Sequence, residues 1–238
     1  MRTLGKVAAV TGLIALCLWV LVNSAWPGYT HSYRLICDVE VDGQSRSGSS
    51  VFEVTWRTQP GMSASAWSTD VRGDAVFVDL GDRGALLIPN QTYPVSEEPS
   101  EPLRYLALVA FGEELSMRGK YSVTSQALTK LSKLAGSKIL PSDEMPQFIW
   151  LKNINDQASA QVIRPSQFAE IIGGNAVLKS LTIEMTKEKP TTHMLEKKLP
   201  WLRQAAIRES KLGVITSPGI YSLENYRLKA RHLMGSED

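Results

Sequence analysis

An uninterrupted apolar stretch near the N-terminus constrains this chain more than any other feature. Residues 7–22, VAAVTGLIALCLWVLV, carry no charged side chain, and the six residues before them include Arg2 and Lys6 but no acid. A helix over residues 7–26 would span about 30 Å, which matches the hydrocarbon core of a bilayer. We therefore expect residues 1–26 to be a membrane anchor, with the N-terminus in the cytoplasm and the bulk of the chain across the membrane.

A cleaved signal peptide is the alternative interpretation of the same stretch. Secretory apolar regions usually run for about 7–15 residues, and this one is slightly longer. Val22-Asn23-Ser24 supplies a small-residue cleavage site, so secretion to the periplasm after cleavage near residue 24 stays open. A lipoprotein site at Cys17 is disfavoured, because bulky Leu16 precedes it and apolar residues follow it.

The remaining residues, 27–238, have the composition of a globular protein. Hydrophobic residues make up 43% and charged residues 21% of the chain. About 210 residues are enough to bury a core without disulfides. Outside the apolar stretch Cys37 is the only cysteine, so we expect it to be a buried small hydrophobe. The formal net charge of +2 argues against a nucleic-acid-binding protein.

The charges are unevenly distributed along the chain. Acids outnumber bases between residues 27 and 118, and bases lead from residue 178 onward. Two interpretations remain: solvated faces of opposite sign, or a basic end that contacts an anionic partner or membrane headgroups.

The first half of the globular part predicts four strands. Residues 33–42 alternate between apolar and polar side chains, which indicates a half-buried strand. Asp42-Gly43 starts a turn, a polar Gly/Ser loop covers residues 43–50, and a second strand follows at 51–56. Two more strands, 74–80 and 84–89, flank a turn at 81–84. We expect an antiparallel meander or a small barrel-like sheet.

The second half predicts short helices and further strands. A segment rich in Pro, Ser and Glu, residues 94–102, is a candidate boundary within the exported part, and residues 103–111 fit a helix or a buried strand. The remaining expected helices are 122–135 (capped by Ser122 or Thr124), 167–172, 193–199 (capped by Thr192), 201–212 and 221–233, and the remaining strands are 147–152, 159–163 and 176–186. The predicted fold is α+β, with antiparallel hairpins and several short helices after one N-terminal transmembrane helix.

No pattern in the sequence singles out a catalytic, cofactor-binding or metal-ligating residue. His31, His193 and His232 are scattered, and the chain has no CxxC, HExxH, GxSxG, P-loop or GxGxxG motif. We therefore expect no metal and no cofactor. Two acidic places, Asp143-Glu144 and the turn at residues 153–156, fit tight turns better than paired catalytic carboxylates.

Four other features have an ordinary structural interpretation. Ser47 to Ser50 lack the strand–turn–helix setting of a nucleophile. Arg72-Gly73-Asp74 spells an integrin-type tripeptide, but its Gly fits a strand entry. Asn90-Gln91-Thr92 is a formal glycosylation sequon. The tryptophans outside the anchor are expected in the core, with a ligand groove as the alternative, at positions 56, 67, 150 and 201.

Several runs follow one another in a characteristic order: YRLICDVEVDG, RGDAVFVDLGDRGALL, MPQFIWLKNINDQASAQVIRPSQFAEIIG, IEMT and LPWL. In this order they resemble a group of uncharacterised bacterial proteins with one N-terminal membrane segment. The run MPQFIWLKNINDQ departs from the group in lacking a Pro after its Asn-Asp pair. The resemblance implies a bacterial envelope setting and carries over no activity and no functional residue.

Together these features favour a non-enzymatic envelope protein. Its expected partners are the membrane, through residues 7–26, and an envelope protein, with no nucleic acid. The alternatives are an envelope hydrolase that uses carboxylate or Ser chemistry, and a cytoplasmic protein whose N-terminal helix is buried.

Overall fold

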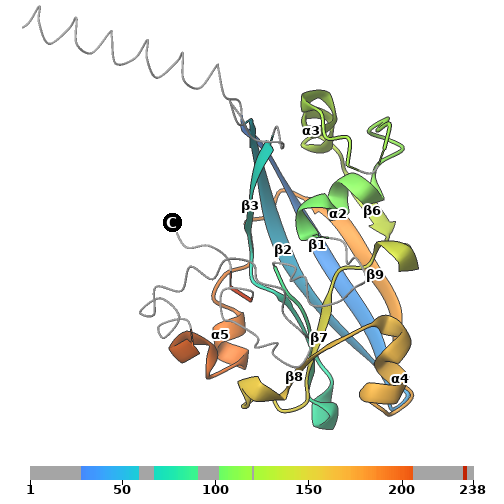
Figure 1. Ribbon diagram of the computed structural model, residues 1–238, viewed down its shortest axis with the longest axis vertical. Helices are drawn as coiled ribbons and strands as arrows, with labels where there is room; N and C mark the ends of the chain where they lie inside the picture. The colour runs from blue at the N-terminus through green and yellow to red at the C-terminus, as the bar shows by residue number, and fades with distance from the viewer. Residues whose placement is uncertain (1–27, 59–66, 91–101, 120, 206–232, 235–238) are drawn as a thin grey trace, which may run out of the picture.

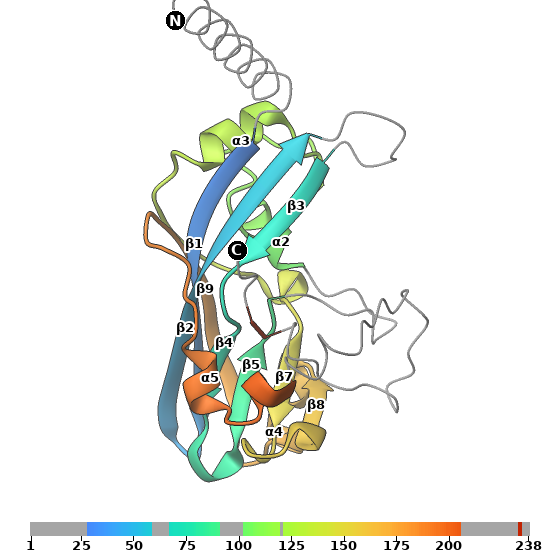
Figure 2. The same ribbon diagram turned by 90° about the vertical axis from the view of Figure 1, so that its left-hand side faces the viewer.

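The computed structural model describes residues 28–58, 67–90, 102–119, 121–205 and 233–234. They form two antiparallel β-sheets with a few short helices (Figure 1, Figure 2). The predicted α+β class with antiparallel strands is therefore confirmed. The expected anchor, residues 1–26, lies outside the described part of the chain, as does nearly all of the segment 94–102.

The larger sheet has five strands in the order β3-β2-β1-β9-β6. They are β1 (Gly28–Val41), β2 (Gln44–Thr58), β3 (Trp67–Arg72), β6 (Gly136–Ile139) and β9 (Val177–Thr186). The β1–β2 hairpin runs along most of the height of the described part of the chain (Figure 2). β9 pairs with the opposite side of β1, with Thr186 opposite Ser32.

The alternation predicted for residues 33–42 is confirmed. The side chains of the apolar series are all buried, and they are Tyr33, Leu35, Cys37, Val39 and Val41. We call the face of the sheet that carries them the inner face. Burial raises the pKa of the Cys37 thiol to about 12, so this cysteine is a buried small hydrophobe as expected.

The prediction of a loop over residues 43–50 is wrong. Asp42 and Gly43 alone make the turn, with φ of 50° and 71° as in the tight hairpin turns, and β2 begins at Gln44. Two small residues of this segment, Gly48 and Ser50, meet the small sheet or the segment leading into it. Gly48 lies on the inner face, where a Cβ would lie 2.1 Å from the carbonyl oxygen of Phe77. Ser50 is buried beside it and donates to the carbonyl of Asp74.

The smaller sheet has four strands in the order β4-β5-β7-β8. They are β4 (Val76–Asp79), β5 (Ala85–Ile88), β7 (Phe148–Leu151) and β8 (Ala160–Ile163). The strands expected at 74–80, 84–89, 147–152 and 159–163 are thus present, and the turn at 81–84 contains a short 3-10 helix, Gly81–Arg83.

The prediction of a single meander of four strands is wrong, because the two predicted hairpins belong to different sheets. A further strand, β3, lies between the two predicted hairpins, follows β2 and extends the large sheet. After β3 the chain turns at Gly73, where φ is 137°, and enters the second sheet. Residues 73–76, Gly-Asp-Ala-Val, are all buried, and no periodic pattern in the sequence marks the bend.

The two sheets and their flanking segments form layers. The inner face of the large sheet packs against one face of the small sheet in the main core, which also contains residues from both sides of the segment 94–102. The other face of the small sheet packs against α5 (Leu195–Lys198) and the residues that follow it. The buried apolar residues of this second cluster are Ala75, Leu87, Ile149, Leu151, Leu195, Leu199, Leu202, Ala205 and Leu233.

Two helices cover the inner face near the start of β1 (Figure 1). The ambiguous segment 103–111 is a helix, α2 (Leu103–Ala110), and Tyr33 donates from its hydroxyl to the Leu103 carbonyl. The helix expected over 122–135 is shorter, α3 (Ser125–Leu131). The Thr124 side chain caps it by accepting from the Ala127 amide. The residues after the expected helix, 136–139, pair with β9 and form the strand β6.

The later helices are also shorter than expected. Residues 165–171 form a 3-10 turn, Pro165–Gln167, followed by α4 (Phe168–Ile171). The residue before α5 is Met194, and Thr192 does not cap this helix. Residues 202–205 have helical backbone, while the rest of the helix expected over 201–212, and all of that over 221–233 except Leu233, lie outside the described residues.

Candidate interaction face

The outer face of the large sheet, opposite the core, is polar. Many of its side chains carry a hydroxyl, including Ser32, Ser47, Ser49, Thr55, Thr182 and Thr186. An antiparallel sheet that is solvated on one side has this alternation. The face therefore belongs to the surface of the part of the chain described here.

Charges of opposite sign are paired along this face. Lys179 lies 3.1 Å from Glu40, Arg72 lies 3.8 Å from Glu53, and Ser180 donates to Asp38. Exposed pairs of this kind contribute about 0–1 kcal/mol each. These pairs place charges of opposite sign next to one another on the face.

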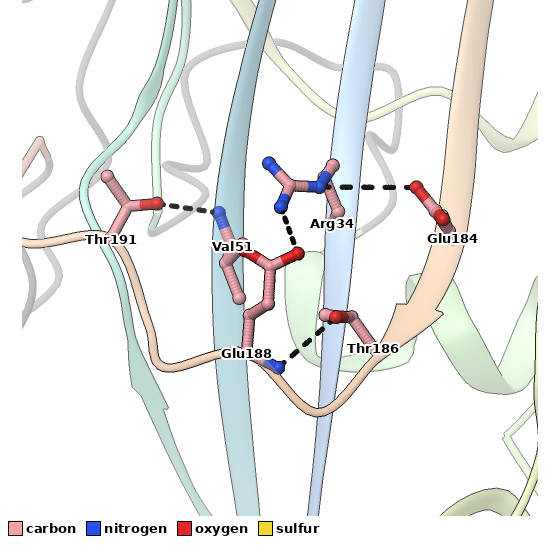
Figure 3. A network of polar contacts seen from close by, with 6 residues as sticks. All are labelled: Arg34, Val51, Glu184, Thr186, Glu188 and Thr191. Carbon is pink, nitrogen blue, oxygen red and sulfur yellow. Dashed lines mark hydrogen bonds and ion pairs between the residues drawn. The ribbon is translucent and has the colours of Figure 1, made fainter.

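A short segment crosses the outer face from β9 to β2, and we call residues 187–191 the strap (Figure 3). Arg34 on β1 lies beneath it, 2.5 Å from Glu188 and 4.0 Å from Glu184. At the far end Thr191 accepts from the Val51 amide through its hydroxyl and donates from its own amide to the Val51 carbonyl. The strap thus covers Val51, which is buried although it lies on the outer face.

The edge strand β6 differs from the rest of this face. Ile139 is 70% exposed, the highest value for any large hydrophobic residue in the described part of the chain. It lies in one row with Thr182 and the half-buried Ile36. An exposed isoleucine on a strand edge is unusual, because natural proteins protect edges with charges, prolines or covering segments.

The backbone of β6 is also open on one side. Leu140 donates to the Leu181 carbonyl, and antiparallel pairing alternates between bonded and non-bonded residues. The amides and carbonyls of Ser137 and Ile139 therefore point away from β9. Among the described residues no strand pairs with this side of β6. We call these groups, together with the Ile139 side chain, the β6 edge.

The only charged side chain of β6 does not protect the edge. Lys138 points to the inner side, where its ammonium lies 2.5 Å from Glu114 and 6.0 Å from the centre of the Phe111 ring. The ion pair raises the pKa of Lys138 and lowers that of Glu114. This lysine is therefore held against the domain.

The other strand edges are protected or covered. β3 presents Asp70 and Arg72 along its length. β4 is preceded by Ala75, whose amide donates to the Leu233 carbonyl. The edge of the small sheet at β8 has a half-buried or buried side chain at three of its four positions. This comparison makes the β6 edge the strongest candidate for contact with a partner.

The histidines lie in unrelated places. His31 is 4% exposed on the inner face of β1, stacks on Tyr33, and its Nε2 has no hydrogen-bond partner. Burial, with a smaller contribution from Lys187, lowers the pKa of His31 to about 4. His193 lies 3.5 Å from Glu196, and His232 is outside the described residues. Within those residues no three His, Cys, Asp or Glu side chains are placed to hold a metal.

The candidate carboxylates lie in turns. Asn153 and Asp156 accept from the amides of Asn155 and Ala158 in the connection between β7 and β8. Asp143 and Glu144 lie in a 3-10 turn, Ser142–Glu144. The structure brings neither pair together with Ser50, whose hydroxyl is used in the core.

The tripeptide and the sequon are both structural features. Asp74 is 4% exposed and accepts from the amides of Met194 and Leu195 at 2.9 and 3.2 Å. Asn90 is buried, and its side-chain amide donates to the carbonyls of Gly73 and Met234.

The four tryptophans pack against the two cores. Trp56 and Trp150 are buried, Trp67 and Trp201 are partly buried, and three of them donate their indole N–H to a backbone carbonyl. Ser137 and Ile139 were not singled out from the sequence. Four residues, Gly-Ser-Lys-Ile, are too few for a periodic signal, and an edge is defined only by pairing with a distant strand.

None of the helices in the described part of the chain is long and apolar enough to span a bilayer. Comparisons of the chain with known protein families, with curated proteins and with solved structures find no match.

Proposed function

We propose that this chain is a non-enzymatic bacterial envelope protein. In this proposal residues 7–26 hold it in the inner membrane, the N-terminus is cytoplasmic, and residues 27–238 bind a protein partner in the periplasm. The observation that carries the binding role is the β6 edge, where open backbone groups and Ile139 lie together.

The chemistry of the edge favours a partner that adds an extended strand. Ser137 and Ile139 each offer one amide and one carbonyl toward solvent, with the spacing of a β-ladder. Main-chain hydrogen bonds supply affinity in such contacts, and alternate side chains supply specificity. A strand paired there would place an apolar side chain beside Ile139 and a hydroxyl or small side chain beside Ser137.

The anchor is supported by the sequence alone. The basic residues Arg2 and Lys6 precede sixteen residues without a charge, and Trp19 and Trp26 suit the far interface. The resemblance to bacterial proteins with one membrane segment points to the same setting. Alkaline extraction of membranes tests this part: an integral protein stays in the pellet, and release into the supernatant contradicts the anchor. A mature N-terminus near residue 24 would support the secreted alternative.

The binding role is tested with three variants of the full chain. Ile139→Lys places a charge on the edge, and Ser137→Pro removes an outward amide that β9 does not use. Ser49→Lys is the matched control, because Ser49 is exposed on the same outer face, with two strands between β2 and β6. The bait is a tagged full chain purified from detergent-solubilised envelopes.

We expect one or more envelope proteins to copurify with the unmodified chain and with Ser49→Lys. Ile139→Lys and Ser137→Pro lose them, while their circular dichroism spectra stay unchanged. Equal recovery with all four proteins contradicts a role for the β6 edge. Turnover of an envelope substrate by the purified chain contradicts the non-enzymatic part and favours the hydrolase alternative.

A further inference from the structure

A series of aromatic rings lies at the end of the molecule where β1 begins. Tyr29, Trp67, Trp56, Tyr105 and Tyr121 are in consecutive contact, with ring centres 5.8, 6.5, 5.4 and 5.0 Å apart. The series runs from the buried Trp56 to the surface, where Tyr121 is 56% exposed. Tyr121 is one of four large hydrophobic residues exposed in the described part of the chain, and the only aromatic one.

This end is built from four segments that meet in space. β1 starts there, β2 ends there and β3 starts there, and α3 lies beside them (Figure 1, Figure 2). The register places Tyr29 opposite Trp56, and Trp67 opposite Thr58. The Trp67 indole donates to the Val123 carbonyl, which ties the sheet to the segment before α3.

The proposed anchor ends only one residue before this end. The anchor ends at Trp26, and β1 begins at Gly28. Three residues of fully extended chain reach at most about 11 Å, so Tyr29 lies within about 11 Å of Trp26. The polar headgroup region on each side of a bilayer is about 5–8 Å thick. The chain is therefore too short to hold the aromatic end far from the lipid.

The side chains at this end suit that location. Tyr and Trp collect at the headgroup level, because their rings are apolar and their tips form hydrogen bonds. The exposed basic residues Arg57 and Arg104 lie on the same end, Arg104 over the ring of Tyr105, and Lys130 is exposed on α3. Cationic side chains near a bilayer surface are attracted by anionic lipids.

We propose that this end, presenting Tyr29, Trp67 and Tyr121, lies against the headgroups of an anionic phospholipid bilayer. The inference rests on the proposed anchor and adds an orientation to it. β1 then stands away from the membrane, and its other end lies roughly 45 Å farther out at 3.3 Å per residue. Asp42 at that end is joined to Arg83 by hydrogen bonds of 3.1 Å, so the turn at Gly81–Arg83 is the distal tip.

The test uses the full chain in vesicles of phosphatidylethanolamine and phosphatidylglycerol, with a nitroxide attached to one introduced cysteine. Ser122→Cys labels the aromatic end beside Tyr121, and Asp82→Cys labels the distal tip. Both positions are exposed. Cys17→Ser removes the cysteine of the apolar stretch, and Cys37 is fully buried with a raised pKa, so it does not compete for the label. Collisions of the label with oxygen and with a water-soluble nickel chelate report its depth.

We expect the ratio of oxygen to nickel collisions to be higher at position 122 than at position 82. Tyr121→Ser and Arg104→Ser should shift the ratio at position 122 toward the aqueous value. If the protein stays in the pellet after alkaline extraction but the collision ratios at both positions are equal and aqueous, the proposed orientation is overturned. Release of the protein by alkaline extraction instead overturns the anchor, and the orientation with it.

Discussion

Gly48 of β2 and Phe77 of β4 are in backbone contact between the two sheets. A Cβ at position 48 would lie 2.1 Å from the Phe77 carbonyl oxygen and 2.8 Å from its carbonyl carbon. Real side chains do not approach a backbone this closely, so the glycine sets the distance between the sheets. The same contact explains the glycine at position 48, which belongs to a run that resembles a loop in the sequence.

Gly48→Ala should therefore destabilise the protein by forcing β4 away from β2. Overpacking of this kind costs about 1–3 kcal/mol. Ser49→Ala is the matched control, because Ser49 is the next residue on the strand and its side chain is exposed on the other face. Urea denaturation followed by tryptophan fluorescence measures both. An equal midpoint for Gly48→Ala and the unmodified protein would show that the sheets are not in contact at this point.

His31 should make the protein sensitive to acid. Its pKa is about 4 in the folded state against 6.5 for a free histidine, so both states are neutral above pH 6.5. Below pH 6.5 the unfolded chain binds a proton at His31, whereas His31 of the folded protein stays neutral until the pH approaches about 4. The free energy of unfolding therefore falls between pH 6.5 and about pH 4, and at about pH 5 the loss is about 2 kcal/mol.

His31→Phe keeps a ring stacked on Tyr33 and removes this titration. The stability of the variant should fall less between neutral pH and about pH 5 than that of the unmodified protein. Urea denaturation at the two pH values gives the comparison. Parallel losses in the two proteins would assign the acid sensitivity to other groups.

Asp74 should be required for the docking of α5. Its carboxylate accepts from the amides of Met194 and Leu195, and both would lose their partner in Asp74→Ala. Leaving buried donors unpaired costs about 1–3 kcal/mol. Asp74→Asn keeps an acceptor oxygen and should lose less stability. Asp82→Ala, at an exposed position, should be neutral. Thermal unfolding ranks the three variants, and an equally small effect of all three would contradict the role of Asp74.

The strap should protect the Val51 amide from exchange with solvent. That amide donates to the Thr191 hydroxyl at 3.0 Å. Thr191→Val removes the acceptor and keeps the shape, so the Val51 amide should exchange faster, with a loss of about 1 kcal/mol. Thr191→Ser retains the hydroxyl and serves as the control. Hydrogen–deuterium exchange resolves the two, and unchanged exchange in Thr191→Val would contradict the strap contact.

Local patterns in the sequence predicted much of the secondary structure. The face of β1 that carries Tyr33 and Leu35 follows from alternation, and the Asp42-Gly43 turn follows from the need for positive φ. The helix cap at Thr124 and the β7–β8 hairpin also follow from short-range chemistry. In each case the residues that decide the structure are close in the sequence.

The arrangement of the strands depends on contacts that no local pattern contains. β1 pairs with β9, with Ser32 opposite Thr186. The residue pattern of neither strand indicates which strand it pairs with. The glycine at position 48 of β2 is explained only by β4, a separate element. The β6 edge could not be predicted for the same reason, since Ile139 is exposed only because β6 is the last strand of the sheet.

Photo-crosslinking in living cells tests the central claim most directly. A benzophenone amino acid placed at position 139 of the full chain should give discrete crosslinked products in the membrane fraction. The products should disappear when Ser137→Pro is added, and position 49 on the same outer face should give none. No product from position 139, or the same products from positions 139 and 49, would contradict a partner bound at the β6 edge.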